Sequence, residues 1–386
     1  MKKNNITEQS PSNRANKGFR NVNKTGHKAG KQNGPVTIGL DLGDKSSRYC
    51  VLNEEGEVVL ERSVGSTKKA MTQVFGAIPR CRIAMEVGTH SPWVSRLLER
   101  LGHEVIVANA RQVKLISQSS RKNDRLDAEM LARLARVDPQ LLRPIRHRSE
   151  QAQGHLMVIR VRAALVEART RLVNAARGLA KSMGERLPKC DTDQMGEERL
   201  QTLPQGLRET LKPLLQEVKS LTEKIKECDV KLEQIARTEY PETCLLQQVS
   251  GVGTLIALTF VLTVEDKQRF VKSRDVGCFV GLRPKQSDSG ESKPQLPITK
   301  EGDRYLRKLL VQGAHCILSH RGPDTDLKRW GLQLSDRGGK NAKKRAIVAV
   351  ARKLGILLHR LWVTGEVYEP LRNSQAVAKQ KKTVAA

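Results

Sequence analysis

The stretch VTIGLDLGDKSSRYCVL, residues 36–52, consists of two short apolar runs separated by a polar turn. β-Branched and aromatic residues flanked by Gly, Asp and Ser are typical of strands joined by a turn. The stretch therefore predicts a β-hairpin whose first strand ends near Asp41. The place of this one acidic residue guides the interpretation of the segments that follow.

A second strand is predicted at residues 82–85, and it delivers Glu86 at its C-terminal end. Apolar residues at helical spacing predict a helix over residues 93–101, and a further strand follows at residues 104–108. The order β-β, then β-α-β predicts a mixed sheet with parallel crossovers. Sites in open α/β sheets form beyond the C-terminal ends of strands, so Asp41 and Glu86 are expected at such a site.

A helix is predicted over residues 124–137, with Asp124 and Asp127 on the face that continues through Ala128 and Leu131. Two interpretations of this pair stay open. In one, Asp124 caps the helix and Asp127 complements the helix dipole. In the other, both carboxylates point toward the core side, where burial is costly unless a cation such as a metal ion compensates it.

These four acids stand in a strongly basic chain. Its 386 residues hold 69 Lys and Arg against 41 Asp and Glu, which gives a formal net charge of +28. Such a charge attracts polyanions and is typical of proteins that bind nucleic acid. Carboxylates gathered against that background favour a site for two Mg²⁺ ions, roughly 4 Å apart, that acts on a phosphodiester.

The same segments resemble the N-terminal domain of the DEDD insertion-sequence transposases. The matching stretches lie within residues 34–143 and read IGLDLGDKSS, AMEVGTHSPWVSRLLERLGHEVIVANARQVKLI and KNDRLDAEMLARL. The resemblance implies a RuvC-like, RNase H-type fold. It also implies that Asp41, Glu86, Asp124 and Asp127 are the catalytic metal ligands.

Composition argues against several other classes of protein. The seven cysteines form no CxxC pair and no Cys/His ligand spacing, so neither a zinc site nor a disulfide framework is predicted. The longest apolar run, residues 254–264, is too short to cross a membrane. Aromatic residues make up 3% of the chain, so recognition should depend on phosphates and shape more than on stacking. These features predict a cytoplasmic protein that acts at the nucleoid and has no membrane partner.

The chain divides into five predicted segments. Residues 1–34 form a basic arm, predicted to be disordered, that serves either non-specific nucleic-acid contact or solubility. The remaining segments are a RuvC-like domain at 35–145, long helices at 150–240, a mainly helical C-terminal domain at 241–370 and a polar tail at 371–386.

The central segment is predicted to form two long helices with sustained heptad spacing. The apolar positions are Val158, Val161, Leu165, Ala168, Leu172, Ala175 and Leu179 in the first helix, and Leu211, Leu214, Val218, Leu221, Ile225, Cys228, Leu232 and Ile235 in the second. An antiparallel coiled-coil hairpin and a seam with a second subunit both satisfy the pattern. Five arginines outside the first seam form either a solvated face or a strip that binds nucleic-acid backbone. They are Arg160, Arg162, Arg169, Arg171 and Arg177.

Near the start of the C-terminal domain, LLQQVSGVGT at residues 245–254 resembles a helix-hairpin-helix element. Gly251 and Gly253 allow a tight turn, and the next helix would direct free N–H groups at a phosphate. Many helical turns need glycine for conformation alone, so a purely structural role stays open. Further nucleic-acid contacts are expected from a helix that opens at Thr299, and their residues are Lys300, Arg304 and Arg307.

This domain resembles the second domain of the same transposases. GLRP at 281–284 and TKEGD at 299–303 frame a loop rich in Ser and Gly. The family has a catalytic serine in this loop, and the matching position is Ser289, with Ser287 as its competitor. A hydroxyl needs a base or a metal to become nucleophilic, and the loop contains no His. The loop departs from the family's Gly-rich and basic pattern at Asp288, Glu291, Pro294 and Pro297.

Together these features predict a DNA transposase or recombinase. The resemblance implies that the acidic and serine domains meet in a composite site between subunits of a homo-dimer or homo-tetramer. It further implies a covalent serine–DNA intermediate and a structured guide RNA as partner. Three alternatives remain. A Holliday-junction-type nuclease would use the four acids with water as nucleophile, and an actin-like ATPase or sugar kinase has a similar Asp-x-Gly turn after a strand. A purely structural RNA-binding protein would bind nucleic acid without cleaving it.

Overall fold

The computed structural model describes residues 35–109, 124–287, 289–292, 294 and 296–374. The chain divides into two compact units, Met1–His147 and Arg148–Ala386. The predicted basic arm at 1–34 and most of the predicted polar tail lie outside the described residues, as does the side chain of Asp124.

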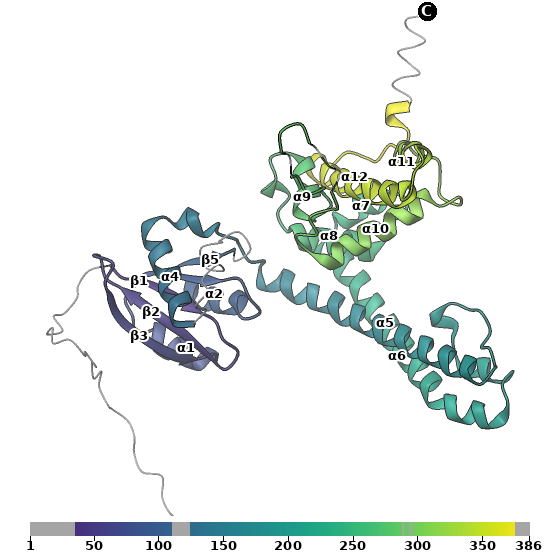
Figure 1. Cartoon of the computed structure of the whole chain (residues 1–386), viewed down its shortest axis with the longest axis horizontal. Coiled ribbons are helices and arrows are strands. Elements are labelled where there is room, and N and C mark those ends of the chain that lie inside the picture. Colours follow the sequence, from purple (N-terminus) through teal and green to yellow (C-terminus); the bar gives the residue numbers. More distant parts are fainter. Residues whose placement is uncertain (1–34, 110–123, 288, 293, 295, 375–386) are drawn as a thin grey trace, which may run out of the picture. The chain divides into compact units, whose positions relative to one another are not determined.

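The N-terminal unit is built on a mixed sheet (Figure 1). Its strands are β1 (Thr37–Asp41), β2 (Ser46–Leu52), β3 (Val58–Gly65), β4 (Arg82–Glu86) and β5 (Glu104–Ala108), in the order β3-β2-β1-β4-β5. β1 pairs antiparallel with β2 and parallel with β4, and β4 pairs parallel with β5. The predicted hairpin and mixed sheet are confirmed, and this α/β arrangement is consistent with a RuvC-like domain. Strand β3 and helix α1 (Lys68–Phe75) add to the predicted order.

Helices cover both faces of this sheet. On one face, the buried side chains of Ile38 and Met85 share a core with Met71 of α1 and Leu98 of α2 (Ser91–Arg100). On the other face, Ala84 packs with α4 (Asp124–Val137), and the short turn η1 (Pro139–Leu142) closes that layer. Successive side chains of a strand point to opposite faces, which is why each strand supplies both cores.

The C-terminal unit begins with two long helices, α5 (Glu150–Ser182) and α6 (Gln205–Glu239). The first turns of α5, at Leu156, share a core with Ile235 near the end of α6. The last turns of α5, at Ala176, share a core with Leu211 near the start of α6. The two helices therefore form an antiparallel hairpin within one chain. The turns η2 (Thr192–Gln194) and η3 (Glu197–Leu200) lie in the connection.

The predicted seam on the first helix is only partly the contact face with α6. Val158 and Leu172 of the seam are half-buried against the cores that α5 shares with α6, whereas Val161 is 54% exposed and Leu179 is 50% exposed. The fully buried residues of α5 lie beside the seam, namely Ala152, Leu156, Ile159, Val173, Ala176 and Ala180. The second seam is confirmed at most positions, since Leu211, Val218 and Ile225 are buried. The hairpin thus leaves Val161 and Leu179 of this seam exposed.

The arginines of α5 have partners within the chain. Their contacts are Arg160 with Asp303, Arg162 with Asp229, Arg169 with Thr222, Arg171 with Glu167, and Arg177 with the carbonyl of Cys190. Guanidinium groups held in this way are less available to phosphates. The structural interpretation of these arginines is therefore favoured over a nucleic-acid-binding strip.

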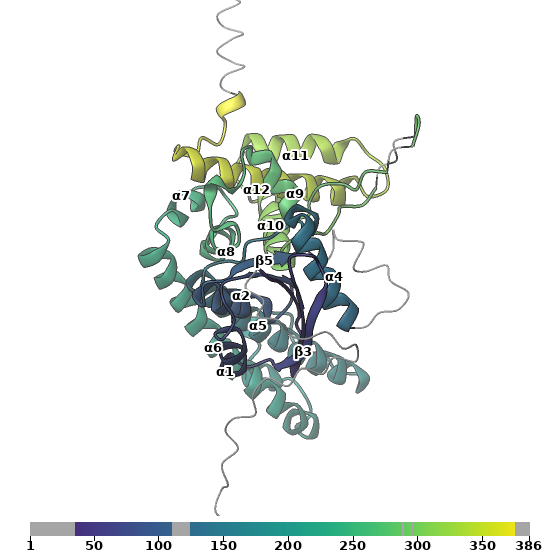
Figure 2. The same cartoon turned by 90° about the vertical axis from the view of Figure 1, so that its left-hand side faces the viewer.

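The rest of the C-terminal unit is a helical bundle around α8 (Thr254–Val264). Nine residues of α8 are buried, which explains why its sequence is apolar all round. The surrounding helices are α7 (Thr243–Gln247), α9 (Val276–Phe279), α10 (Arg304–Leu318), α11 (Asp326–Asp336) and α12 (Ala342–Thr364), with the turns η4 (Lys267–Arg269) and η5 (Ser273–Asp275). Figure 2 shows α11 and α12 running side by side.

The helix predicted to open at Thr299 begins instead at Arg304. Lys300 and Gly302 both have positive φ angles, of 59° and 74°, which no α-helix accommodates. The carboxylate of Asp303 then caps α10 by accepting the backbone N–H of Leu306 at 2.7 Å. Across the described ranges, no helix combines the length and apolar character needed to cross a membrane.

Candidate active site

Asp41 and Glu86 end two neighbouring parallel strands. The pairing of β1 with β4 sets Leu40 opposite Met85, so the next residue of each strand comes side by side at one edge. Neighbouring strands lie about 4.8 Å apart. Leu40 and Met85 both point into the α1–α2 core, so by alternation Asp41 and Glu86 belong to the opposite face, which α4 covers.

Helix α4 crosses β1 unusually closely. A Cβ atom added to Gly39 would lie 1.9 Å from the carbonyl oxygen of Ala128 and 2.6 Å from the nitrogen of Ala132. Only glycine allows this approach. Since Gly39 precedes Asp41 by two residues, it shares the face of Asp41, and Asp127 directly precedes the point of contact.

Helix α4 also runs antiparallel to the parallel strands. Arg82, the first residue of β4, donates a hydrogen bond to the carbonyl of Ala135 near the end of α4, with an Nη1–O distance of 3.1 Å. The C-terminal half of α4 therefore lies at the N-terminal ends of the strands. Its first turn, where Asp124 and Asp127 stand in the sequence, lies toward the strand ends that carry Asp41 and Glu86.

The turns after β1 and β4 meet at this same edge. His90 Nε2 lies 3.6 Å from the carboxylate of Asp44, and His90 Nδ1 accepts a hydrogen bond from the indole N–H of Trp93 at 3.2 Å. A neutral imidazole that accepts at Nδ1 carries its proton on Nε2, which faces Asp44. His90 is a candidate that the sequence motifs leave without a role. Its only signal is its place four residues after Glu86, in EVGTHS.

The four predicted acids thus come from three elements that converge on one edge of the sheet. Oxygen donors of this kind suit Mg²⁺. Within the described residues, no three His, Cys, Asp or Glu side chains lie close enough together to hold a metal ion. The side chain of Asp124 lies outside these described residues. Asp41 and Glu86 both engage other groups in the chain, and Asp127 is half-buried.

The second predicted site, the serine loop, lies in the C-terminal unit on a tightly packed base. A Cβ atom on Gly281 would lie 2.1 Å from the carbonyl oxygen of Glu301, and one on Gly302 would lie 1.9 Å from that of Phe279. Both glycines have positive φ angles. The two motifs that frame the loop are therefore pressed together backbone to backbone, which gives a physical reason for their glycines.

The loop leaves this base as a narrow ladder. The N–H of Thr299 donates to the carbonyl of Arg283 at 2.9 Å, and the N–H of Lys285 donates to that of Pro297 at 2.9 Å. At the tip, Ser289 and Ser292 exchange backbone hydrogen bonds of 3.2 and 3.0 Å around Gly290, whose φ is 55°. Ser289 is exposed at this tip, as is Ser287.

The residues predicted to contact nucleic acid differ in their surroundings. Arg307 donates from Nη1 to the carbonyls of Val280 at 2.9 Å and Glu301 at 2.8 Å, so it fastens the base of the loop. Burial also lowers the pKa of Arg307. Lys300 and Arg304 are exposed beside it.

The GVG turn serves packing as well as chain reversal. Gly251 has a φ of 82°, and a Cβ atom there would lie 2.9 Å from the carbonyl oxygen of Gly313 in α10. Gly253, at the start of α8, is exposed and has open space around it. The structure thus gives Gly251 a structural function and leaves Gly253 at an accessible helix N-terminus.

Two family models match this chain. One, described as a transposase of the DEDD IS110 type, matches residues 38–184. The other, described as the transposase IS116/IS110/IS902 family, matches residues 244–328. The first span contains the four acids, and the second contains the serine loop.

Curated relatives match over most of the chain. The transposase for insertion sequence element IS1111A of Coxiella burnetii is 29% identical over 344 residues, which are 86% of this chain and 90% of the relative. A probable family 20 transposase of Pseudomonas aeruginosa is 29% identical over 86% of this chain and 98% of its own length. The transposase for element IS1328 of Yersinia enterocolitica is 29% identical over 73% of this chain and 83% of its own length.

These matches remove the sugar-kinase alternative, because both halves of the chain match transposases and none of the reported relatives is a kinase. The chain belongs to the IS110 family of DEDD transposases and is a DNA transposase.

Proposed function

We propose that this transposase excises and inserts its element by cleaving and joining DNA strands at a site that holds two Mg²⁺ ions. The observation that carries the proposal is the position of Asp41 and Glu86 at the ends of adjacent parallel strands, beside the first turn of α4. Asp41, Glu86, Asp124 and Asp127 would be the ligands, since carboxylate oxygens suit Mg²⁺. The ions would supply charge stabilisation for the attacking and leaving oxygens of the phosphodiester.

Replacing the strand-end acids tests this proposal. Asp41→Ala and Glu86→Gln should abolish Mg²⁺-dependent strand cleavage and leave DNA binding nearly intact, because binding rests on Lys and Arg elsewhere. Glu55→Gln is the matched control, since Glu55 is exposed in the turn after β2 and takes no part in the candidate site. Cleavage at the wild-type rate by Asp41→Ala would refute the assignment.

We propose further that Ser289 forms a covalent intermediate with DNA. Its hydroxyl oxygen would attack a phosphate, displace a DNA hydroxyl and leave a phosphodiester between serine and DNA. Attack on that ester by another DNA hydroxyl would then join the strands and restore the serine. The exposed position of Ser289 at the tip of the ladder supports this role. The loop carries no His, so a group outside the loop would have to accept the proton.

A trapped adduct separates the serine pathway from hydrolysis by water. Denaturing a reaction with labelled DNA should leave DNA attached to the wild-type protein and to Ser287→Ala. Ser289→Ala should lose the adduct and keep the fold, because an exposed hydroxyl contributes little to stability. Cleavage without any adduct would favour the Holliday-junction-type nuclease mechanism instead.

A guide RNA is the proposed partner that selects the DNA sequences. The net charge of +28 supports a polyanionic partner of this kind. Sequencing the RNA that copurifies with the protein is the direct test. We expect one structured RNA encoded beside the gene, and a mixture that mirrors total cellular RNA would contradict the proposal.

Two exposed positions of the first seam, Val161 and Leu179 of α5, support a homo-oligomer. Val161 and Leu179 belong to a heptad repeat, and such a repeat on an exposed helix face fits a second helix. The double variant Val161→Asp, Leu179→Asp should therefore reduce the mass measured by light scattering. Val271→Asp is the control, because Val271 is 96% exposed outside any helix. An unchanged mass for the double variant would remove this stripe as the interface.

A further inference from the structure

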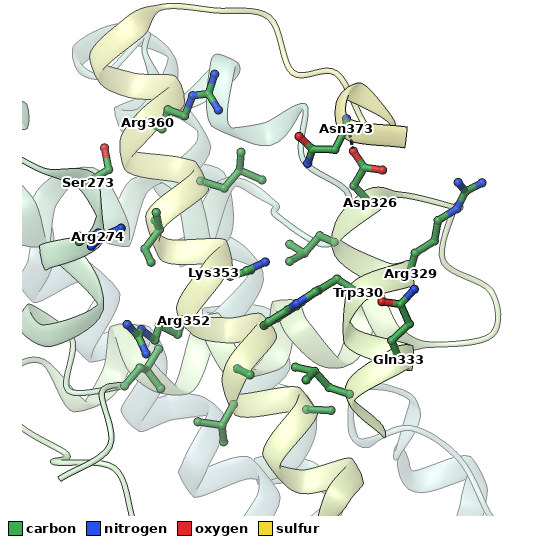
Figure 3. A pocket seen from close by; sticks show the side chains of 18 of the residues that line it. Ser273, Arg274, Asp326, Arg329, Trp330, Gln333, Arg352, Lys353, Arg360 and Asn373 are labelled. Atoms are coloured by element: carbon green, nitrogen blue, oxygen red, sulfur yellow. Dashed lines mark hydrogen bonds between the residues drawn. The ribbon is translucent and has the colours of Figure 1, made fainter. Parts of the chain in front are cut away.

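A wide groove lies in the C-terminal unit between α11 and α12. Its volume is about 2100 Å³, and the chain segment 366–374 and the base of the serine loop complete its walls. The floor is apolar, with Trp330, Leu334, Ile356 and Leu357 among its residues. Figure 3 shows Trp330 from α11 and Lys353 from α12 pointing toward each other across it.

The rim of the groove is strongly cationic. Ten Lys and Arg line it against three Asp and Glu. The carboxylate of Glu366 already accepts hydrogen bonds from Arg360 at 3.1 Å and Arg372 at 2.8 Å. Among the described residues, six of the cations have no ion pair, namely Lys272, Arg274, Arg337, Lys344, Arg352 and Lys353. The groove therefore combines an apolar floor with an uncompensated positive rim.

Trp330 already contacts a cation of the chain itself, Lys353. The ammonium nitrogen of Lys353 lies 3.6 Å from the centroid of the Trp330 ring, a cation–π contact. Burial lowers the pKa of Lys353, so its cation is poorly solvated there. An aromatic base stacked on Trp330 would displace this ammonium toward the phosphate that accompanies the base.

Charge identifies the class of occupant. The segments of this chain outside the described residues are all basic, with eight Lys or Arg against one Glu in 1–34, four against none in 110–123, and three against none in 375–386. A second copy, at +28, is also repelled. The occupant must be a polyanion with apolar flat groups. Bases paired inside a duplex are not available to the floor, whereas unpaired bases are.

We propose that the α11–α12 groove binds a single-stranded nucleic-acid segment, with a base stacked on Trp330 and phosphates on the cations of both rims. This inference rests on the proposed function, because it names the site at which the transposase holds an unpaired strand. The proposal assigns the binding of an unpaired strand to this groove and strand cleavage to the acidic edge of the N-terminal unit. It also identifies Trp330 as a stacking residue in a chain with few aromatics.

Binding to labelled dT20, U20 and a 20-base-pair duplex, measured by fluorescence polarisation on the full chain, tests this site. Trp330→Ala should weaken single-strand binding by roughly 5- to 150-fold, the range expected for one lost base stack. Arg337→Gln with Lys344→Gln should lower the salt slope by about one for each lost phosphate contact. Lys219→Gln with Lys226→Gln, both exposed on α6, is the matched control and should change the affinity less. Tighter binding of dT20 or of U20 would identify the strand as DNA or RNA.

A second readout does not depend on Trp330→Ala folding normally. Single strands should quench the tryptophan fluorescence of the wild type, and Trp330→Phe should lose most of that quenching while still binding. Wild-type affinity in both groove variants, equal losses for the duplex, or equal losses for polyglutamate would overturn the proposal. Asp41→Ala should bind dT20 normally, so failure of the groove and failure of the cleavage site give different results.

Discussion

Gly39→Ala tests how the fold places the acids. The added methyl carbon would lie 1.9 Å from the carbonyl oxygen of Ala128, whereas ordinary contacts begin at 3.4 Å, so α4 must retreat from β1 by about 1.5 Å. Overpacking of this kind destabilises by about 1–3 kcal/mol. For a unit of this size that lowers the unfolding midpoint by roughly 2–12 °C.

The effect on activity should exceed the effect on stability. A retreat of α4 carries Asp127 away from Asp41, and a misplacement of about 1 Å lowers rates by roughly 100-fold. Excision of the element from a plasmid, measured by PCR across the emptied site at a permissive temperature, should therefore fall about 100-fold or more. DNA affinity, measured in parallel, should stay within a few-fold of wild type.

Gly65→Ala provides the matched control in the same sheet. Its added methyl would meet only the Cβ of Ala70 at 3.5 Å, an ordinary contact. This variant should excise at nearly the wild-type rate with little change in its unfolding midpoint. If Gly39→Ala behaves as Gly65→Ala does, the close approach of α4 does not position the site.

Three further predictions concern the C-terminal unit and the whole chain. Gly302→Ala should lower both excision and stability, because the added Cβ would lie 1.9 Å from the carbonyl oxygen of Phe279. Gly338 has a similar φ of 76° but open space around it, so Gly338→Ala should show only the effect of backbone strain. Burial lowers the pKa of His359 below its usual 6.5, so the unfolded state binds a proton at a higher pH than the folded state does. Stability should therefore fall as the pH drops below about 6.5. The unfolding temperature of His359→Gln should lose this dependence on pH, and that of the exposed His320→Gln should keep it. Nucleic-acid affinity should drop by roughly 10³- to 10⁵-fold between about 50 and 200 mM salt if about 6–10 phosphates are contacted, and a salt-independent affinity would contradict phosphate-dominated binding.

The sheet and its acidic edge could be predicted from sequence because the signals are local. An apolar, partly β-branched run marks β1, and Asp41 follows from the place where that run ends. The convergence of α4 on the same edge could not be predicted from the sequence. Its only local signal is Gly39, and the reason that a glycine is required there is the close approach of Ala128, which only the structure shows. Strand β3, with its Glu-Arg-Ser interior, lacks the apolar run that marked the others.

The face of α5 could not be predicted because the helix carries two apolar stripes. Heptad spacing favours Val161 and Leu179, whereas the core that α5 shares with α6 is built on Val173, Ala176 and Ala180. The alanines let the two helices approach closely and leave Val161 and Leu179 exposed. Helix α10 begins after the predicted Thr299 for a different reason. Gly302 has a positive φ angle, which the pattern of apolar residues does not reveal.

The α11–α12 groove could not be predicted from the sequence for a third reason. Trp330 and Lys353 are 23 positions apart, and only the packing of α11 on α12 brings them into contact. Low aromatic content predicts little stacking overall, and it does not exclude one well-placed ring.

Metal rescue at Asp41 tests the central claim most directly. Mg²⁺ coordinates thiolate sulfur poorly, whereas Mn²⁺ and Cd²⁺ accept it more readily. Asp41→Cys should therefore cleave DNA at a background rate in Mg²⁺ and recover cleavage when Mn²⁺ or Cd²⁺ is added, and the exposed control Glu55→Cys should cleave normally in Mg²⁺ alone. If Asp41→Cys is active in Mg²⁺, or stays inactive with every metal while it folds and binds DNA, Asp41 is not a metal ligand and the acidic edge is not the cleavage site.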